Sequence, residues 1–295
     1  MKLLILGSEG FVGNNLVEGL SNNHEIICAD LFPQSVHENY SQFDITNLQS
    51  VDKVIRNVDV VINLAAHSLV SSLDGSIVNA QVNIIGLLNV LESCRKNGIN
   101  KIIFTSASSM VGTPNSEKVS ETHITFPKTA YGVTKLASEH YLRLYHELYG
   151  LNYVIFRFFN IYGPHQQNGL IPNLYNRIKK NDVLTVFGKG DQIRDYVYIK
   201  DIVSFFEQVI DSDIGNNQIF NMGTGKGTTI SEIIDILSQS LHVSPLVENK
   251  SERPGEIGNF VADTAKLESF FGRIPLTTVQ SGIKETVEWL ENIKD

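Results

Sequence analysis

The sequence predicts an α/β protein built on a doubly wound parallel sheet. Short apolar segments of strand length alternate with segments of helical periodicity through the first half of the chain. This alternation is typical of parallel strands with helices on both faces of the sheet. A glycine-rich segment, residues 7–13, joins the first expected strand, residues 3–6, to the first expected helix. At 295 residues, the chain is long enough for one large domain or for two smaller ones.

The composition argues against several classes of partner. Hydrophobic residues make up 42% of the chain and charged residues 19%, as in globular soluble proteins. The formal net charge is −8, and an acidic surface repels both nucleic acids and anionic membranes. We therefore expect neither nucleic acid nor a membrane as a partner.

The cysteines and the apolar start of the chain point to a cytoplasmic protein without a metal. Cys28 and Cys94 are the two cysteines, and they show neither a disulfide framework nor a metal-ligand spacing with histidines. The apolar run at residues 2–6 is too short for a secretion signal or a membrane span.

Three glycines, Gly7, Gly10 and Gly13, are spaced as in a phosphate-binding turn. In such a turn the first glycine permits the tight bend, the second lets the backbone approach a pyrophosphate, and the third lets the helix pack on the strand. Phe11 and Val12 then lie in the first helical turn, where free backbone N–H groups face the phosphates. The segment therefore predicts a dinucleotide cofactor.

An acidic residue selects between the two nicotinamide dinucleotides. Asp30 ends the second expected strand, residues 25–30. A carboxylate at this place accepts hydrogen bonds from the adenosine ribose and repels a 2′-phosphate. The residues that follow it, Leu31, Phe32 and Pro33, include no arginine to receive such a phosphate. NAD is therefore predicted as the cofactor.

Tyr131 and Lys135 form the candidate catalytic pair. They are four positions apart in a helical segment, so their side chains lie on one face of the helix. A phenol has a pKa near ~10, and an ammonium beside it favours the phenolate. The pair can therefore take a proton from a hydroxyl group and return it.

These motifs occur in the order that is typical of the extended short-chain dehydrogenase/reductase family, and the resemblance covers nearly the whole chain. It implies a Rossmann-like domain and a smaller C-terminal α/β domain that binds a nucleotide sugar. We place the boundary near residue 165, after the break at Gly163 and Pro164. Residues 1–165 would bind NAD, and residues 166–295 would bind the substrate, with part of them returning to the first domain.

Further cofactor contacts follow from the resemblance. Asp44 and Ile45 occupy the place of a pair that contacts the adenine, and Asn83 matches a structural asparagine of the family. The small side chains after the strand at residues 58–64 leave room for a cofactor at the sheet edge. This segment supplies three more candidates, Leu64, Ala65 and Ala66.

The substrate contacts also follow from matched motifs. Asn160, in the segment Arg157–Pro164, corresponds to a residue that binds the diphosphate. Arg194 and Arg253 suit a diphosphate because guanidinium groups give directed, charge-assisted hydrogen bonds. Glu256 replaces an aspartate of the family motif, and Phe260 occupies a position that gates the space beside C2 of the sugar.

The serine-rich loop departs from the family pattern. Counting back five residues from Gly112 leads to Ala107, where the family has a serine or threonine that hydrogen-bonds the reacting sugar oxygen. Ser108 is the candidate for the missing hydroxyl, provided that the loop shifts by one residue. Ser106, on the other side of Ala107, is a second candidate for binding the substrate.

The same loop indicates the reaction. A 4,6-dehydratase of this family uses an Asp-Glu pair where this chain has Ser108 and Ser109, and serines do not perform that acid–base chemistry at neutral pH. Decarboxylases of the family also carry a glutamate here. The resemblance thus implies a 4-epimerase of a nucleotide-diphosphate sugar, with a UDP-hexose or UDP-hexuronate favoured, in polysaccharide biosynthesis.

Three functions other than a 4-epimerase stay open, and a state of assembly is also expected. The alternatives are an NAD(P)H-dependent nucleotide-sugar reductase, a dehydratase and a non-catalytic nucleotide-binding homologue. The apolar helices at residues 83–92 and 131–145 are paired in a four-helix bundle in the resembling family, which implies a homodimer.

Overall fold

The computed structural model describes residues 1–69, 71, 75–252, 257–272 and 276–293. The chain divides into two compact units. Unit 1 contains Met1–Gly112, Glu121–Phe158 and Val203–Asn221, and unit 2 contains Thr113–Ser120, Phe159–Ile202 and Met222–Asp295. The chain thus first leaves unit 1 at residue 112 and finally returns to it at residue 203.

Unit 1 is built on a seven-stranded sheet with the order β11-β6-β5-β4-β1-β2-β3. The register pairs from β3 to β6 are all parallel. Since the order reverses between β1 and β4, the carboxyl ends of these two strands flank the place where ligands bind in open α/β sheets. The predicted doubly wound α/β fold is confirmed. The strands are β1 (Lys2–Leu6), β2 (Glu25–Asp30), β3 (Tyr40–Gln42), β4 (Val60–Asn63), β5 (Lys101–Ala107), β6 (Asn152–Phe158) and β11 (Gln218–Met222).

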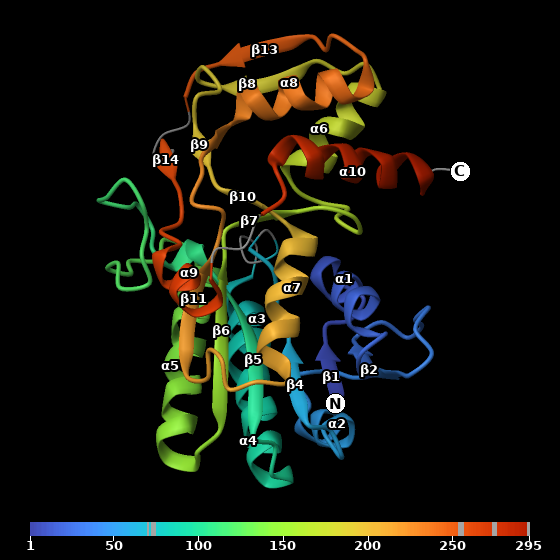
Figure 1. Ribbon diagram of the computed structural model, residues 1–295, viewed down its shortest axis with the longest axis vertical. Helices are drawn as coiled ribbons and strands as arrows, with labels where there is room; N and C mark the ends of the chain where they lie inside the picture. The colour runs from blue at the N-terminus through green and yellow to red at the C-terminus, as the bar shows by residue number, and fades with distance from the viewer. Residues whose placement is uncertain (70, 72–74, 253–256, 273–275, 294–295) are drawn as a thin grey trace. The chain divides into compact units, whose positions relative to one another are not determined.

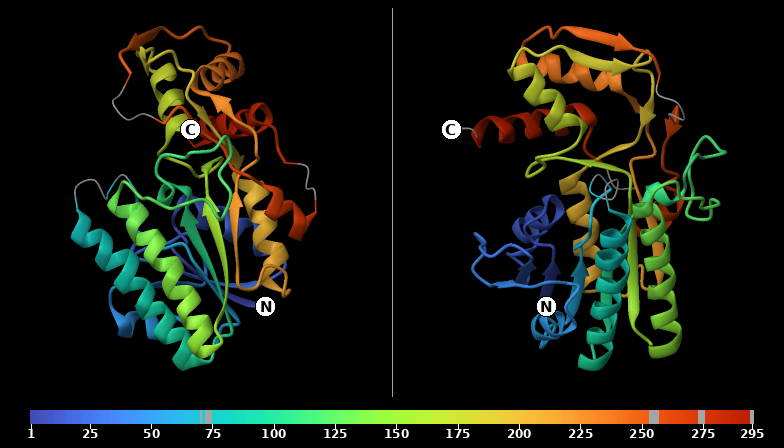
Figure 2. Two further views of the ribbon diagram at one scale, coloured as in Figure 1. Left: turned by 90° about the vertical axis from the view of Figure 1, so that its left-hand side faces the viewer. Right: turned by 180° about the vertical axis from the view of Figure 1, so that it is seen from behind.

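Helices cover both faces of this sheet (Figures 1 and 2). On one face, α2 (Leu48–Val54), α4 (Gly86–Asn97) and α5 (Ala130–Tyr149) share a core with β1, β4, β5 and β6. On the other face, α1 (Phe11–Leu20) meets α7 (Ile199–Ile210) at Gly19 and Val203. The strands are apolar along their length because a sheet covered on both faces exposes neither side to water.

The sequence itself sets the ends of the two longest helices beside the sheet. The side chain of Thr129 accepts a hydrogen bond from the N–H of Gly132 and caps the start of α5. Gly98 and Gly150 end α4 and α5 in the left-handed conformation, with φ of 69° and 73°. A five-residue π-helical turn, Gln81–Ile85, connects α3 (Ser76–Ala80) to α4.

Ser76–Asn97 is long and apolar enough to cross a membrane by length and composition alone. In this fold, 44% of its most apolar window is buried inside the protein. Ile77, Val78 and Ile85 of this segment are exposed, and they bear on assembly below.

Unit 2 is a second α/β unit with short strands. β7 pairs with β10 and β8 with β13, both parallel, while β9 pairs antiparallel with β12 and parallel with β14. Its strands are β7 (Asn160–Tyr162), β8 (Leu184–Phe187), β9 (Ile193–Arg194), β10 (Tyr196–Tyr198), β12 (Thr228–Thr229), β13 (Val247–Lys250) and β14 (Asn259–Phe260). Its helices are α6 (Leu170–Lys179), α8 (Ile230–Leu241), α9 (Ala265–Phe271) and α10 (Val279–Asn292), together with the first residues of α7.

Truncation of Phe156 should measure how much the core of unit 1 depends on its aromatic cluster. Phe156 is fully buried, and its ring centroid lies 4.9 Å from that of Phe206 and 6.2 Å from that of Phe220. We expect Phe156→Ala to lower the free energy of unfolding by about 3–5 kcal/mol in urea titrations. Phe126→Ala is the control, because Phe126 is 72% exposed. Equal losses in the two variants would contradict this account of the core.

Candidate active site

The three glycines form a tight cradle at the end of β1. Gly7 has φ of +89°, and a Cβ there would lie 2.9 Å from the Ala65 nitrogen. A Cβ on Gly13 would lie 2.3 Å from the Gly7 carbonyl oxygen, whereas one on Gly10 would meet only that oxygen, at 3.4 Å. Gly7 and Gly13 are therefore required by the fold itself, and Gly10 keeps its backbone open to a ligand.

The residues after the glycines and after β4 complete this edge of the sheet. Phe11 and Val12 are the first residues of α1, whose N-terminal cap is Gly10. Leu64 continues from β4 and donates its N–H to the Leu6 carbonyl at 2.9 Å. It is followed by Ala65 and Ala66, so the small residues flank the reversal between β1 and β4. The arrangement fits a dinucleotide, with its pyrophosphate at the start of α1.

Asp30 lies at the end of β2, as the sequence predicts. Its Oδ2 accepts the N–H of Glu9 at 3.0 Å, and its Oδ1 accepts the N–H of Leu31 at 2.6 Å. Burial raises the pKa of Asp30, and these two backbone donors oppose the shift. Each carboxylate oxygen retains a lone pair for a ribose hydroxyl.

Asp44 and Ile45 make local contacts that shape the start of α2. The Asp44 Oδ1 accepts both the N–H and the hydroxyl of Thr46, at 2.8 and 2.7 Å. Ile45 is 7% exposed and contacts the helix at Gly86, and its carbonyl accepts a hydrogen bond from Asn89. A contact of either residue with adenine stays a prediction.

The catalytic pair lies in the first two turns of α5. Lys135 is 2% exposed, and its Nζ donates to the Thr105 carbonyl of β5 at 2.8 Å. The same Nζ lies 4.6 Å from the ring centroid of Phe104 and 5.6 Å from that of Tyr131. The structure therefore brings the tyrosine ring and the ammonium together at the carboxyl end of β5.

Burial acts against the predicted effect of Lys135 on Tyr131, which stays a prediction for the complex with NAD. Burial raises the pKa of Tyr131 to about 12 and lowers the pKa of Lys135 to about 7, the latter against the opposing charge of Glu139. Desolvation disfavours the charged form of both groups.

The serine-rich loop follows β5 without an inserted residue. β5 stays in register with β6 through the pair of Ala107 and Phe158, and Ser108 then begins a short 3-10 turn. Ser106 is 2% exposed, and its Oγ has no hydrogen-bond partner among the described residues. The Oγ of Ser109 is likewise buried without a partner in the described part of the chain.

Ser109 is a candidate that the sequence reasoning missed as a hydroxyl donor. Its carbonyl lies against the first turn of α5, since a Cβ on Gly132 would be 2.9 Å from it. The strand register ends at Ala107, so the one-residue shift proposed for Ser108 stays a prediction. Ser106, Ser108 and Ser109 are therefore the three candidate hydroxyls next to Ala107 in the chain.

Asn83 links the segment after β4 to the catalytic helix. Its Oδ1 accepts the N–H of His67 at 2.7 Å, and its Nδ2 donates to the hydroxyl of Thr134 at 3.1 Å. That hydroxyl in turn donates to the Oδ1 of Asn79 at 2.9 Å. Asn83 thus has the structural role that the resemblance implies. Sequence reasoning missed Thr134 and Asn79, although Thr134 lies between the two catalytic residues.

A buried ion pair supports α5 one turn beyond Lys135. Arg157 donates to both carboxylate oxygens of Glu139, at 2.9 and 2.8 Å, and both side chains are almost fully buried. Arg157 also donates to the Glu121 carbonyl at 2.9 Å. Sequence reasoning missed this pair, whose only signal is that Glu139 follows Lys135 by four positions.

In unit 2, three of the predicted substrate residues lie around β9. Asn160 donates its side-chain amide to the Asp195 carbonyl at 3.2 Å. Arg194, next to Asp195, is partly exposed and pairs in register with Phe260. The Phe260 ring is 8% exposed and lies 5.3 Å from the ring of Phe159. Arg253 and Glu256 lie outside the described residues.

Asp195 fixes the loops around this group. Its fully buried carboxylate accepts the N–H groups of Thr224, Gly225 and Ala262 at 2.8, 2.9 and 3.1 Å. Burial raises its pKa, and these donors oppose the shift. Asp195 therefore holds the segments that flank Arg194 and Phe260.

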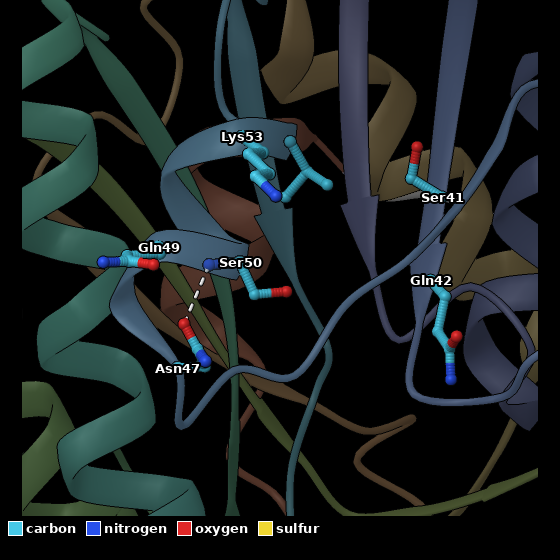
Figure 3. Close-up of a pocket in the computed structure, with 7 residues that line it drawn as sticks. Ser41, Gln42, Asn47, Gln49, Ser50 and Lys53 are labelled. Carbon is cyan, nitrogen blue, oxygen red and sulfur yellow. Dashed lines mark hydrogen bonds between the residues drawn. The ribbon is translucent and has the colours of Figure 1, made fainter.

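The hollow shown in Figure 3 belongs to a different part of unit 1. It has a volume of about 400 Å³ and is lined by residues of β3 and α2 that are polar except for Val54, with Lys53 as the one charged residue among them. None of the predicted site residues lines it. Across the described ranges, no cluster of three or more His, Cys, Asp or Glu side chains could hold a metal ion.

Comparison with known proteins agrees with this arrangement. The model of the NAD dependent epimerase/dehydratase family matches residues 3–223. A putative UDP-glucose 4-epimerase of Methanocaldococcus jannaschii is 33% identical over 98% of each chain.

Solved structures resemble the whole chain. A UDP-glucose 4-epimerase of Thermotoga maritima, crystallised with UDP-glucose, has a TM-score of 0.91 and 29% identity over 100% of both chains. A UDP-glucuronic acid 4-epimerase of Bacillus cereus, in complex with UDP-glucuronic acid and NAD, has a TM-score of 0.90 and 27% identity, over 99% of this chain and 100% of the other.

The buried Lys135 predicts how stability changes with pH. Its pKa rises from about 7 in the native protein to its ordinary value of 10.5 on unfolding. Between these values the unfolded chain binds more protons, so this residue makes the free energy of unfolding rise with pH. Relative to Lys135→Met, the cofactor-free wild type should gain up to about 1 kcal/mol per pH unit in urea titrations between about pH 7 and 9.

Lys284→Met provides the control, because Lys284 is exposed on α10. This variant should keep the wild-type dependence on pH. A stability difference between wild type and Lys135→Met that is constant with pH would contradict the burial of a titrating ammonium.

Proposed function

Because the chain belongs to the NAD dependent epimerase/dehydratase family, we propose that it interconverts two UDP-sugars that differ at C4, with NAD as its cofactor. The observation that carries this proposal is the pair formed by the half-buried Tyr131 and the buried Lys135, beside a loop that has serines where a dehydratase needs acids. The similar proteins described above, which are named as 4-epimerases of UDP-glucose and UDP-glucuronate, support the same reading.

Tyr131 is the residue that moves the proton. Bound NAD supplies hydride chemistry at the sugar carbon, and the phenol oxygen of Tyr131 takes the proton of the 4-hydroxyl and returns it. At a pKa of about 12, the phenol is protonated at neutral pH, so it needs a positive charge to act as a base. Lys135 provides that charge when it is protonated, and its bond to Thr105 keeps Nζ close to the ring.

The serine hydroxyls orient the sugar oxygen. We assign this role first to Ser108, with Ser106 and Ser109 beside it, because Ala107 has no donor of its own. A hydroxyl that binds the reacting oxygen stabilises the charge that develops there during proton transfer.

The nucleotide is assigned to unit 2. The side-chain amide of Asn160 donates to the carbonyl of Asp195, the residue that follows Arg194. Asn160 and Arg194 then offer an amide and a guanidinium for a diphosphate. Arg253 and Glu256 are included in this proposal from the sequence motif alone.

The function is tested by incubating the enzyme with a panel of UDP-, GDP- and dTDP-sugars and identifying products by NMR. A C4 epimer formed without net change in the absorbance of reduced cofactor supports the proposal. Net consumption of reduced cofactor would indicate a reductase, and loss of water from the sugar a dehydratase. No product from any sugar would favour a non-catalytic binding protein.

Tyr131→Phe should lower turnover at least ~10²-fold, as expected for loss of a general acid–base group. The variant should still retain NAD, since the glycine cradle and Asp30 are untouched. Tyr141→Phe, on the same helix, is the matched control and should keep wild-type turnover. Near-full activity of Tyr131→Phe would refute the proposed proton transfer.

We also propose a homodimer formed through the outward faces of α3 to α5. Ile77 in α3, Ile85 before α4 and Leu148 in α5 are 76%, 51% and 60% exposed, and exposed apolar side chains are typical of interfaces. Light scattering at micromolar concentration should give the mass of a dimer, and Leu148→Glu should shift it towards the monomer. Leu246→Glu, at a 69% exposed site in unit 2, should not. A monomeric wild type would contradict this assembly.

Phe260 is proposed to limit the size of the sugar substituent at C2. Its ring is fixed against Phe159, so a larger substituent meets a rigid wall. We expect the wild type to have a higher kcat/KM for a UDP-hexose or UDP-hexuronate than for the 2-acetamido sugar. Phe260→Ser should lower the ratio of these two kcat/KM values by about 10-fold. A wild type that prefers the acetamido sugar would contradict the gating role. Thermal unfolding should confirm that the variant is folded.

A further inference from the structure

Glu9 lies inside the glycine segment and directly beside Asp30. Its backbone N–H donates to Asp30 Oδ2 at 3.0 Å. Its side chain is only 15% exposed. The carboxylate of Glu9 is also close enough to Asp30 for its charge to raise the pKa of Asp30.

The side chain of Glu9 is held by the segment that follows β2. Its Oε1 accepts the hydroxyl of Ser35 at 2.7 Å and that of Ser8 at 3.3 Å. The Nε2 of His37 lies 3.5 Å from the same oxygen. These contacts fix the carboxylate between the glycine segment and residues 35–37.

The charge of Glu9 acts on the groups around Asp30. Burial and then the Glu9 charge raise the pKa of Cys28 to about 11. Burial raises the pKa of Tyr40, and the charges of Asp30 and Glu9 add to the shift. Two negative charges therefore act together on the space beside Asp30.

We propose that Glu9 is a second specificity residue that, with Asp30, excludes the 2′-phosphate of NADP, and that Ser35 fixes its carboxylate for this role. Asp30 distinguishes the cofactors by accepting the ribose hydroxyls, whereas Glu9 acts through its charge, because its Oε1 is already bonded to Ser35 and Ser8. A phosphate brought beside two fixed carboxylates is repelled by both. The Nε2 of His37 also lies against Glu9, at 3.5 Å from its Oε1.

A competition experiment tests this inference without relying on activity. The holoenzyme is equilibrated with a mixture of NAD and NADP and desalted, and both cofactors are then extracted and quantified by chromatography. Glu9→Gln should lower the bound NAD:NADP ratio about tenfold, corresponding to one charge removed near the phosphate. Glu18→Gln, the same substitution at an exposed site on α1, should keep the wild-type ratio. Equal ratios in these two variants would overturn the proposal.

Two further variants keep the test decisive if Glu9→Gln binds neither cofactor. Ser35→Ala retains the charge but frees the carboxylate, and it should lower the ratio by a smaller factor. His37→Gln removes the contact of Nε2 with Glu9 but keeps the Glu9 charge, so it should not lower the ratio. An unchanged ratio in Ser35→Ala, or a lowered ratio in His37→Gln, would overturn the proposal. Each cofactor should also raise the midpoint of thermal unfolding. The rise caused by NAD relative to that caused by NADP should rank the variants in the same order as the bound NAD:NADP ratio does.

Discussion

The burial of one ammonium group constrains the whole active-site edge of the sheet. A buried charge is tolerated only where polar groups replace water. Lys135 meets this demand through the carbonyl of Thr105 at the end of β5, so helix and strand must keep their relative position. The bidentate pair of Glu139 and Arg157 fixes the next turn of the same helix to β6. The bonds of Thr134 with Asn79 and Asn83 fix the turn between the catalytic residues. The geometry of Tyr131 is therefore a result of how its neighbours satisfy their polar groups.

Features encoded by local spacing could be predicted from the sequence. The glycine segment, Asp30 and the Tyr131–Lys135 pair all depend on residues within one strand–turn–helix or within one helix. The structure places each of them where the sequence predicts. The reversal of strand order between β1 and β4 follows from the same fold class and brings Ala65 against Gly7.

Features that depend on contacts between distant segments could not be predicted. Arg157 meets Glu139 from a neighbouring strand, and Thr134 meets Asn79 across more than fifty residues of sequence. Glu9 and Ser35 are joined only because β1 and β2 are neighbours. The effect of burial on the Tyr131 pKa was missed for the same reason, since spacing reveals a charged neighbour but not the loss of water around both groups.

The late return of the chain to unit 1 has a consequence for biosynthesis. β11 and most of α7 come from residues 203–222, yet Phe156 of β6 packs against Phe206 and Phe220 in those segments. A nascent chain that has emerged only as far as β6 therefore exposes an apolar strand as an open sheet edge, which is prone to pair with other chains. The last strand of the sheet, β11, becomes available only after about three quarters of the polypeptide has been translated. Unit 1 therefore cannot complete its fold before the segment of unit 2 that precedes residue 203 has been synthesised.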